Sequence, residues 1–338
     1  MKLELHKFDL PLRHTFTISR GSVDVQETLI VALHDGQYCG YGEATTNSYY
    51  SATIESMSSA LHGLAAMLAD WQFTTPDELW TAASVPLADN PFALCALDQA
   101  AHDLWGKRAQ APVYRLWGLD TNCVPHSNFT IGIDTVEKMV RKLQEVPDWP
   151  IYKIKLGTDH DLQIIRELRK HTNAVFRVDA NCAWTADETI SNSYLLRDLN
   201  VEFIEQPLKA EHWQEMRRVR AESALPVIAD ESCIVEADVD RCDGLFHGVN
   251  IKLVKCGGMT PARRMITRAR KLDMKVMIGC MTESTVGISA IAQLLPLLDY
   301  VDMDGAALLA RDIATGAKVE RGRCIYAPEN GNGVQLLT

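Results

Sequence analysis

Three short apolar segments, each closed by a carboxylate, constrain the fold of this 338-residue chain most strongly. The carboxylates are Asp179, Glu205 and Asp230, and each follows a run that is rich in Val, Ile, Phe or Ala. Asp179 and Glu205 are 26 residues apart, and Glu205 and Asp230 are 25 residues apart. That spacing fits one strand, one helix and their loops. Repeats of this kind build a barrel of parallel strands whose C-terminal ends meet at one mouth.

The same alternation continues on both sides of these segments. Helical segments are predicted over residues 135–144, 161–171, 185–199, 211–221, 235–242, 261–272 and 285–297. The predicted strands between them begin near Asn128, Ile151, Val175, Val201, Val227, Val249, Lys275 and Tyr300. The fold class is therefore α/β, and eight strands with seven helices predict a (β/α)7β modified TIM barrel over residues 126–315.

The first third of the chain has a different pattern. Residues 1–45 alternate like strands, and residues 51–120 carry apolar residues at helical spacing. We predict an α+β module over residues 1–125, completed by the C-terminal tail, residues 316–338. The polar segment His14–Ser22 between the first two strands is either a mobile flap or a plain hairpin connection.

Charged residues at the strand ends predict a metal site. Three carboxylates that converge repel one another unless a cation holds them, and hard oxygen ligands suit Mg²⁺. Lys153 and Lys155 share one face of the second barrel strand, and Lys252 ends the sixth, on the opposite side of an eight-stranded barrel. The simpler alternative is that these lysines only neutralise the carboxylates.

This arrangement of charges suits one type of reaction. A substrate carboxylate on the cation makes its α-proton easier to remove, because the cation and an ammonium stabilise the resulting enediolate. A lysine whose pKa is lowered by burial and by neighbouring cations can act as the base. With one lysine on each face, a proton leaves from one side and returns on the other. The expected reaction is a 1,1-proton transfer, that is, a racemisation or epimerisation.

Further candidates lie at the ends of other strands. Asp302 and Asp304 share one face of the eighth strand and could hold a substrate ammonium, or else form a rim pair. Cys280 either lines the pocket or belongs to the core. Thr130 either bonds a substrate or caps its strand, and Glu231 could support Asp230.

These residues resemble a known family. The chain is similar to the muconate lactonizing enzyme subgroup of the enolase superfamily, and within it to the dipeptide epimerases, over nearly its whole length. The matching segments are Lys153–Lys155, Val178–Asn181, Ile204–Pro207, Ala229–Ser232, Asn250–Lys252, Asp302–Asp304 and Ala96–Lys107. Cys182 departs from the family, which usually carries an acidic residue or glutamine there.

The resemblance implies a role for each candidate residue. One Mg²⁺ per subunit would bind Asp179, Glu205 and Asp230. Lys155 would act on the (R) epimer and Lys252 on the (S) epimer, while Lys153 would hold the substrate carboxylate. The N-terminal module would cap the barrel mouth, and Arg20 on its early loop could pair with a glutamate side chain of the substrate. The remaining positions that would contact substrate are Thr130, Cys280, Asp302 and Asp304.

The expected function is thus an Mg²⁺-dependent isomerase, a dipeptide epimerase of the L-Ala-D/L-Glu type, acting in cell-wall peptide metabolism or in general peptide catabolism. The alternatives on the same scaffold are an N-acylamino-acid racemase, an o-succinylbenzoate synthase or a muconate cycloisomerase. Asp302 and Asp304 disfavour them, because those substrates carry no ammonium. A non-catalytic protein is disfavoured by the complete set of metal ligands and lysines.

Composition narrows the partners and the compartment. The formal net charge of −10 argues against nucleic acid and anionic membrane surfaces as partners. Nine cysteines without a CxxC pair suggest reduced thiols and a cytoplasmic protein. The first 20 residues lack a signal-peptide pattern, and no apolar run approaches the length of a membrane span. We therefore expect no transmembrane helix. A homo-oligomer is possible.

Overall fold

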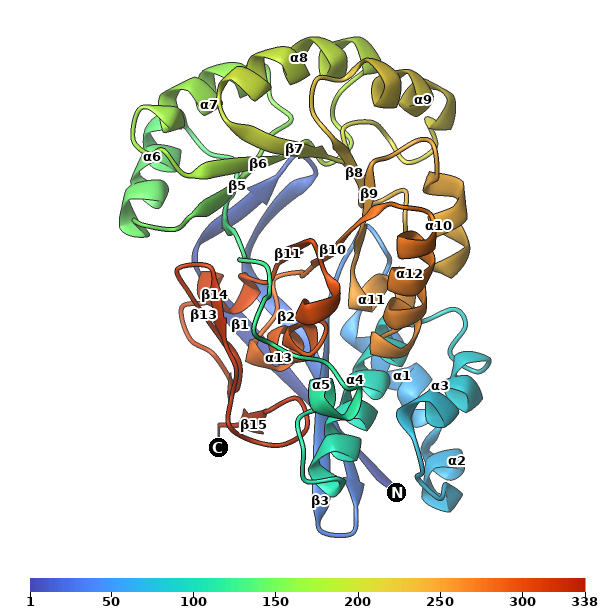
Figure 1. The fold of residues 1–338 in the computed structure, drawn as a ribbon. Coiled ribbons are helices and arrows are strands. Elements are labelled where there is room, and N and C mark those ends of the chain that lie inside the picture. Colours follow the sequence, from blue (N-terminus) through green and yellow to red (C-terminus); the bar gives the residue numbers. More distant parts are fainter. Residues whose placement is uncertain (338) are drawn as a thin grey trace.

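The computed structural model describes residues 1–337, which form an N-terminal sheet with helices followed by a barrel (Figure 1). The sheet is antiparallel, in the order β1 (Lys2–Ile18), β2 (Gly21–Asp35), β3 (Tyr38–Thr45). Its first two strands make one long hairpin that turns at Ser19 and Arg20. Most of the segment predicted as a flap or a connection therefore belongs to these strands, and the plain hairpin is the form observed.

Helices follow the sheet and cover one of its faces. They are α1 (Ile54–His62), α2 (Ala65–Asp70), α3 (Pro76–Ser84), α4 (Pro91–Arg108) and α5 (Val113–Leu116). Helix α4 lies directly on β3, where a Cβ at Gly40 or Gly42 would collide with a carbonyl oxygen of α4. Glycine is required there because two backbones approach closely. Among residues 1–337 no helix combines the length and apolar character needed to cross a membrane.

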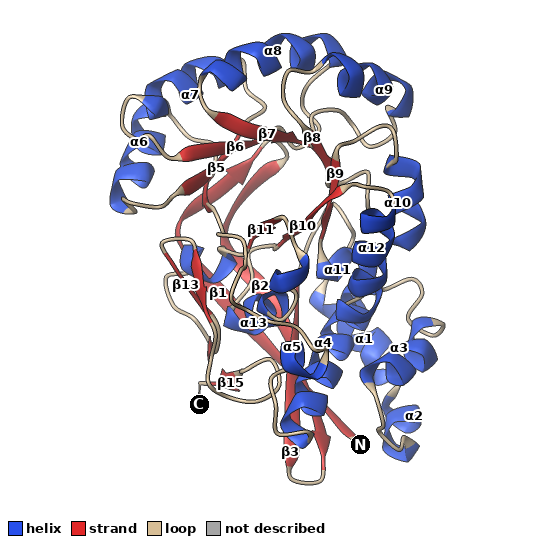
Figure 2. Cartoon of the chain, viewed as in Figure 1, coloured by secondary structure: helices blue, strands red, loops and turns tan. Residues whose placement is uncertain are grey.

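Eight parallel strands form the barrel, which confirms the predicted fold class (Figure 2). Each strand begins within one residue of its predicted start. They are β4 (Phe129–Ile131), β5 (Ile151–Lys155), β6 (Val175–Asp179), β7 (Val201–Glu205), β8 (Val227–Ala229), β9 (Gly248–Ile251), β10 (Lys275–Gly279) and β11 (Tyr300–Asp302). Neighbours in sequence pair throughout, and a parallel bridge between Ser127 and Val301 joins the two ends.

The barrel helices lie mainly outside the strands, as Figure 1 shows. The predicted helices correspond to α6 (Val136–Glu145), α7 (Asp161–Arg169), α8 (Ala186–Asp198), α9 (Trp213–Glu222), α10 (Glu236–Cys242), α12 (Met259–Lys271) and α13 (Thr285–Ala292). A short helix that was not predicted, α11 (Leu253–Cys256), follows β9 directly. It starts one residue after Lys252, so it sits at the mouth of the barrel.

Two buried carboxylates fasten the N-terminal part to the barrel. Glu43 on β3 accepts hydrogen bonds from the backbone N–H of Ser284 (3.0 Å) and of Gly287 (2.9 Å), at the start of α13. Asp98 on α4 accepts the N–H of Thr260 (2.9 Å), at the start of α12. Helix N-termini favour negative charge, which compensates part of the cost of burying these groups. The sheet is thereby held against the barrel.

The C-terminal tail returns to the N-terminal helices. Pro112 pairs with Gly331, and the amine of Lys107 donates to the carbonyl of Val334 at 3.1 Å. The tail contains the strands β12 (Ala314–Thr315), β13 (Lys318–Glu320), β14 (Arg323–Ile325) and β15 (Gln335–Leu336). The domain limits at residues 125/126 and 315/316 stay predictions.

Candidate active site

Three carboxylates meet at the C-terminal ends of neighbouring strands. Asp179 ends β6, Glu205 ends β7, and Asp230 directly follows β8. One oxygen from each lies within 4.8 Å of the others, and all three residues are buried. The parallel barrel produces this convergence, because adjacent strands in register bring their last residues together.

Each of these carboxylates has one oxygen held by the protein. The backbone N–H of Asn181 donates to Asp179 Oδ1 at 2.9 Å. Asn250 Nδ2 donates to Glu205 Oε1 at 2.8 Å, and Lys255 Nζ lies 2.7 Å from Asp230 Oδ1. The second oxygens contact lysine side chains, and Glu205 Oε2 is buried and accepts no hydrogen bond within the described residues. Three fixed carboxylates with convergent second oxygens fit the ligand set of a divalent cation such as Mg²⁺.

Three lysines face these second oxygens. Lys153 Nζ lies 2.8 Å from Glu205 Oε2 and 3.1 Å from Asp179 Oδ2. Lys155 Nζ approaches Asp179 Oδ2 at 2.7 Å, and Lys252 Nζ approaches Asp230 Oδ2 at 2.9 Å. Lys155 ends β5, and Lys252 directly follows β9, four strands away in a barrel of eight. The two lysines therefore come from opposite sides of the mouth.

The pKa values reflect this dense arrangement of charges. Burial opposes ionisation of Asp179, but Lys155 and Lys153 outweigh it and lower its pKa to about 2. Burial and the neighbouring Asp179 raise the pKa of Glu205 to about 7. Burial favours a neutral Lys252, yet Asp230 raises the pKa of this lysine above its ordinary value. The carboxylates thus act against the lowered pKa expected for a catalytic lysine at Lys252, and a divalent cation bound to them would weaken this attraction.

A second acidic cluster lies on the other side of the mouth. It consists of Cys280, Asp302 and Asp304, whose ligand atoms lie within 4.8 Å of one another. Asn128 Nδ2 donates to Asp302 Oδ1 at 2.8 Å, and the backbone N–H of Thr130 donates to Asp304. The Thr130 hydroxyl also donates to Asp304, at 3.3 Å.

The two aspartates of this cluster differ in their pKa. Burial opposes ionisation of Asp302, but Lys153, at 2.9 Å, outweighs it and lowers the pKa. Burial, and then Asp302, raise the pKa of Asp304 well above its ordinary value. Burial and the neighbouring carboxylate therefore favour the protonated form of Asp304, whereas Lys153 favours the ionised form of Asp302. Burial also raises the pKa of Cys280, so its sulfur is a thiol.

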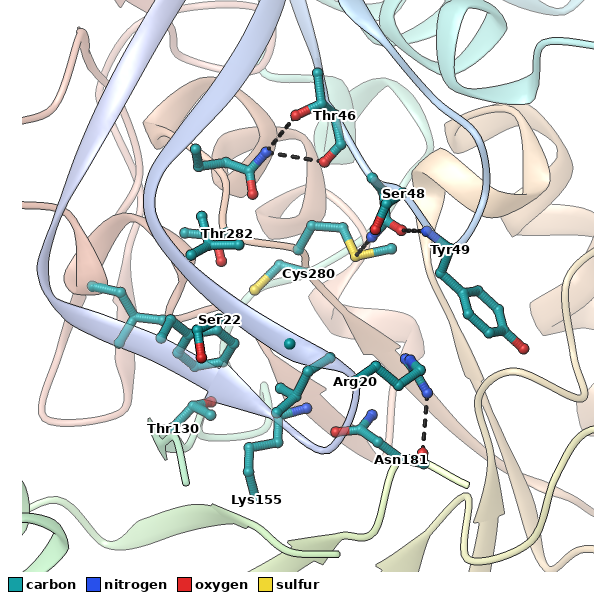
Figure 3. A pocket seen from close by; sticks show the side chains of 18 of the residues that line it. Arg20, Ser22, Thr46, Ser48, Tyr49, Thr130, Lys155, Asn181, Cys280 and Thr282 are labelled. Carbon is teal, nitrogen blue, oxygen red and sulfur yellow. Dashed lines mark hydrogen bonds between the residues drawn. The ribbon is translucent and has the colours of Figure 1, made fainter. Parts of the chain in front are cut away.

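One cavity is lined by the second cluster and by the three lysines that contact the first. It encloses about 400 Å³ beneath the β1–β2 hairpin. Figure 3 shows Thr130, Lys155 and Cys280 around this cavity, with Arg20 at the hairpin turn. All the substrate-contacting positions predicted from the sequence, and both predicted catalytic lysines, line it: Arg20, Thr130, Lys153, Lys155, Lys252, Cys280, Asp302 and Asp304. Their roles stay predictions, but their common location is observed.

Arg20 closes the cavity at the hairpin turn. Its Nη2 donates to Glu231 Oε1 at 2.6 Å, and its Nη1 donates to the carbonyl of Asn181 at 3.1 Å. The ring of Tyr49 stacks under the guanidinium, 4.5 Å from its carbon to the ring centroid. The hairpin turn is thereby attached to the loops that follow β6 and β8.

Sequence reasoning missed three residues that support the clusters. Asn250 lies two positions before Lys252 and therefore on the same strand face, which is a signal that could have identified it. Asn128 comes just before β4, and an asparagine next to a strand does not by itself indicate a role in a binding site. Lys255 lies on the short helix α11, whose four residues show no periodicity. Its contact with Asp230 depends on a backbone turn that local sequence does not indicate.

Family models match both parts of the chain. Residues 3–118 match the mandelate racemase / muconate lactonizing enzyme N-terminal domain. Residues 134–337 match the enolase C-terminal domain-like family. Together these matches cover most of the chain.

Relatives and solved structures agree with these matches. The chain is 55% identical to an L-Ala-D/L-amino acid epimerase of Flavobacterium johnsoniae over 337 residues, covering 100% of both chains. It is 56% identical to a protein of the same name from a Maribacter species, covering 99% of both. A dipeptide epimerase structure from Methylococcus capsulatus, complexed with Mg and L-Arg-D-Lys, superposes with a TM-score of 0.91 at 31% identity, covering 99% of both chains. On this evidence the chain belongs to the mandelate racemase / muconate lactonizing enzyme family of the enolase superfamily.

Proposed function

We propose that this chain is an Mg²⁺-dependent dipeptide epimerase, an isomerase that inverts the α-carbon of the C-terminal residue of a dipeptide. The observation that carries the proposal is the placement of Lys155 and Lys252. They approach one cavity from opposite sides, next to a cluster suited to a divalent cation and opposite one suited to an ammonium. A dipeptide has both matching groups, a carboxylate at one end and an ammonium at the other.

The metal would be held by Asp179, Glu205 and Asp230. When bound, it would stabilise the negative charge that develops on the substrate carboxylate as the α-proton leaves. Lys153 lies within 3.1 Å of two of these ligands and would add an ammonium beside the same carboxylate. Asn250 and Lys255 would keep the ligands oriented from behind.

The proton transfer would belong to the two lysines. Lys155 would remove the α-proton of the (R) epimer, and Lys252 would return a proton on the opposite face to give the (S) epimer. The reverse direction exchanges their roles. Each lysine must be neutral when it acts as base and charged when it acts as acid, so the pair changes protonation state with every turnover. Both side chains are largely buried, which excludes bulk water from the reacting carbon.

The ammonium of the N-terminal residue would bind Asp302 and Asp304. A cation beside two buried carboxylates would be attracted by both and would favour their ionised forms. Thr130 would keep Asp304 in place through its N–H and its hydroxyl. Cys280 would bound the space around the first residue. The names of the relatives support an L-alanine at this position.

The alternatives are not favoured. An N-acylamino-acid racemase, an o-succinylbenzoate synthase and a muconate cycloisomerase act on substrates without a free ammonium. The buried pair Asp302 and Asp304 would face those substrates without a matching charge. The similar proteins named above are epimerases, and the solved structure among them is complexed with a dipeptide.

The cellular setting is a further part of the proposal. The nine cysteines are all free in the structure, which supports a reducing compartment such as the cytoplasm. A role in cell-wall peptide metabolism rests on the resemblance to L-Ala-D/L-Glu epimerases. Homo-oligomerisation and the lack of nucleic-acid or membrane partners stay predictions.

Hydrogen exchange tests the proposed function directly. The protein is incubated with Mg²⁺ in D₂O with a set of L-Ala-L-Xaa dipeptides, and mass spectrometry follows deuterium uptake. We expect one deuterium at the α-carbon of the C-terminal residue, together with the L-Ala-D-Xaa product. Exchange with N-succinyl amino acids but with no dipeptide would overturn the proposal in favour of the racemase.

A further inference from the structure

The paired state of Arg20 bears on which dipeptides fit. A guanidinium that recognises a glutamate side chain must offer its charge to the substrate. In this structure the Arg20 side chain is bound to Glu231 Oε1 at 2.6 Å and to the carbonyl of Asn181 at 3.1 Å. Its charge is therefore compensated from within the protein.

Glu231 is a strong partner because it is buried and fixed. Only 1% of its side chain is exposed, compared with 30% for Arg20. Asn181 Nδ2 also lies 3.5 Å from Glu231 Oε1, while Glu231 Oε2 is buried and accepts no hydrogen bond within the described residues. The pair thus has no net charge. A substrate carboxylate that approached it would meet a guanidinium whose charge a buried carboxylate already compensates.

The position of this pair follows from the topology. Asn181 follows β6 and Glu231 follows β8, so they flank β7, which lies opposite β11 in the barrel order. If the substrate ammonium binds at the end of β11, the C-terminal residue extends toward the β6–β8 side. Its carboxylate goes to the metal ligands, and its α-proton faces a lysine. Its side chain must then leave toward the mouth, where Arg20 and Glu231 line the cavity.

Beside polar residues such as Gln26 and Glu27, the hairpin contributes four apolar residues to the cavity lining. Phe16, Ile18, Val23 and Val25 on the β1–β2 hairpin line the same cavity, and Val23 and Val25 are exposed in the structure. They offer a wall for the aliphatic part of a side chain and no further positive charge. Among the hairpin residues that line the cavity, Arg20 is the one cation.

We infer that Glu231 is a specificity-determining residue: by neutralising Arg20, it makes the C-terminal subsite select uncharged side chains over carboxylates. This inference rests on the proposed function. L-Ala-L-Gln should therefore be a better substrate than L-Ala-L-Glu, although the two have the same shape. A glutamate that binds Arg20 must share that cation with Glu231, and its carboxylate would lie close to a buried like charge.

The test compares these two isosteric dipeptides. We measure kcat/KM for L-Ala-L-Glu and L-Ala-L-Gln at saturating Mg²⁺ and use their ratio, because a general loss of metal binding or folding affects both equally. For the unmodified protein the ratio of Glu to Gln should be about 0.1 or lower. In Glu231→Gln, which frees Arg20, the ratio should rise at least about tenfold.

Three variants control this result. Glu231→Asp keeps the negative charge, so its ratio should stay near that of the unmodified protein. Arg20→Met combined with Glu231→Gln has no cation to offer, and the gain for glutamate should disappear. Glu231→Ala replaces Glu231→Gln if the latter fails to fold by circular dichroism.

The outcomes separate this inference from the proposed function. A ratio above one for the unmodified protein, or a ratio unchanged within about twofold in both neutral Glu231 variants, overturns the role of Glu231. Exchange with other dipeptides would continue in that case. No exchange with any dipeptide would overturn the proposed function, and this inference with it.

Discussion

The two acidic clusters at the barrel mouth differ in how their charge is compensated. Asp179, Glu205 and Asp230 lie at the ends of neighbouring strands and are faced by lysines from several directions. Among the described residues Asp302 contacts one lysine, Lys153, whereas burial and Asp302 raise the pKa of Asp304. The first cluster therefore has a charge and a donor set that suit a divalent cation, whereas the second has room for one monovalent cation. The comparison shows that neighbouring charges and burial decide which kind of cation a pair or triad of buried carboxylates suits.

Removing a ligand from the first cluster should have the largest effect. In Glu205→Gln the buried Oε2 oxygen becomes part of a neutral amide. We expect Mg²⁺ binding to fall below detection in isothermal titration calorimetry and turnover to drop by about 10³-fold or more. A variant that binds Mg²⁺ as tightly as the unmodified protein would break the assignment of this cluster. Glu202→Gln on the same strand is the matched control, since Glu202 binds Arg177 and not the cluster.

Removing one lysine should stop proton transfer on one face of the substrate α-carbon and leave it on the other. Lys252→Ala should lower epimerisation by about 10²–10⁴-fold, because one of two proton-transfer groups is lost. Lys155 would still exchange the α-proton of the L-Ala-D-Xaa epimer in D₂O, and Lys155→Ala should give the opposite pattern with the L,L epimer. Mass spectrometry of each pure epimer measures this. Equal exchange of both epimers in either variant would contradict the two-base arrangement.

Changing the second cluster should weaken recognition of the ammonium and leave the metal in place. Asp304→Asn should lower kcat/KM for L-Ala dipeptides by about 10²-fold, because one partner of a buried charge pair is removed. Mg²⁺ affinity should stay unchanged, and the loss should be much smaller for the N-acetylated dipeptide, which has no ammonium. Steady-state kinetics with both peptides distinguishes the cases. A parallel loss for both would mean that Asp304 acts only on the structure of the site.

The smallest effect is expected from substituting Lys255, which contacts the first cluster from outside the cavity. Lys255 is fully buried and contacts Asp230 Oδ1 at 2.7 Å and the carbonyl of Cys233 at 2.9 Å. Lys255→Met should weaken Mg²⁺ binding by about 10-fold, since it removes a group that orients a ligand from the outer side. Calorimetric titration measures the affinity, and thermal unfolding without Mg²⁺ reports any general destabilisation. Lys255→Arg, which keeps the charge, should lose less; an unchanged affinity in Lys255→Met would show that Asp230 needs no such support.

Much of the fold could be predicted from local sequence. Runs such as Val201–Glu205 combine β-branched and aromatic residues with a fixed spacing, and parallel strands of one barrel must end at one mouth. This is why the convergence of Asp179, Glu205 and Asp230 could be predicted before any contact was known. Lys153 and Lys155 could be placed on one strand face for the same reason, the two-residue period of a strand.

Contacts between distant segments could not be predicted. The sequence predicts shorter strands joined by a polar connection where the structure has one long hairpin over residues 2–35. The outer part of the hairpin is rich in polar residues, so it lacks the apolar alternation that indicates a strand. Lys255 was missed because α11 is too short to show a period. The role expected for Arg20 assumed a free guanidinium, and only the folded chain brings Glu231 to it from 211 positions away.

The sequence by itself determined the barrel, its eight strand ends and the acidic and basic residues placed there, because strand and helix periods are local properties and the spacing of the repeats leaves one topology. Tertiary structure alone decided which oxygen of each carboxylate is held, which aspartate of the second cluster has a raised pKa, and that the cation on the hairpin is already paired. Those are properties of distances and burial between segments far apart in the chain, and electrostatic energies depend on both.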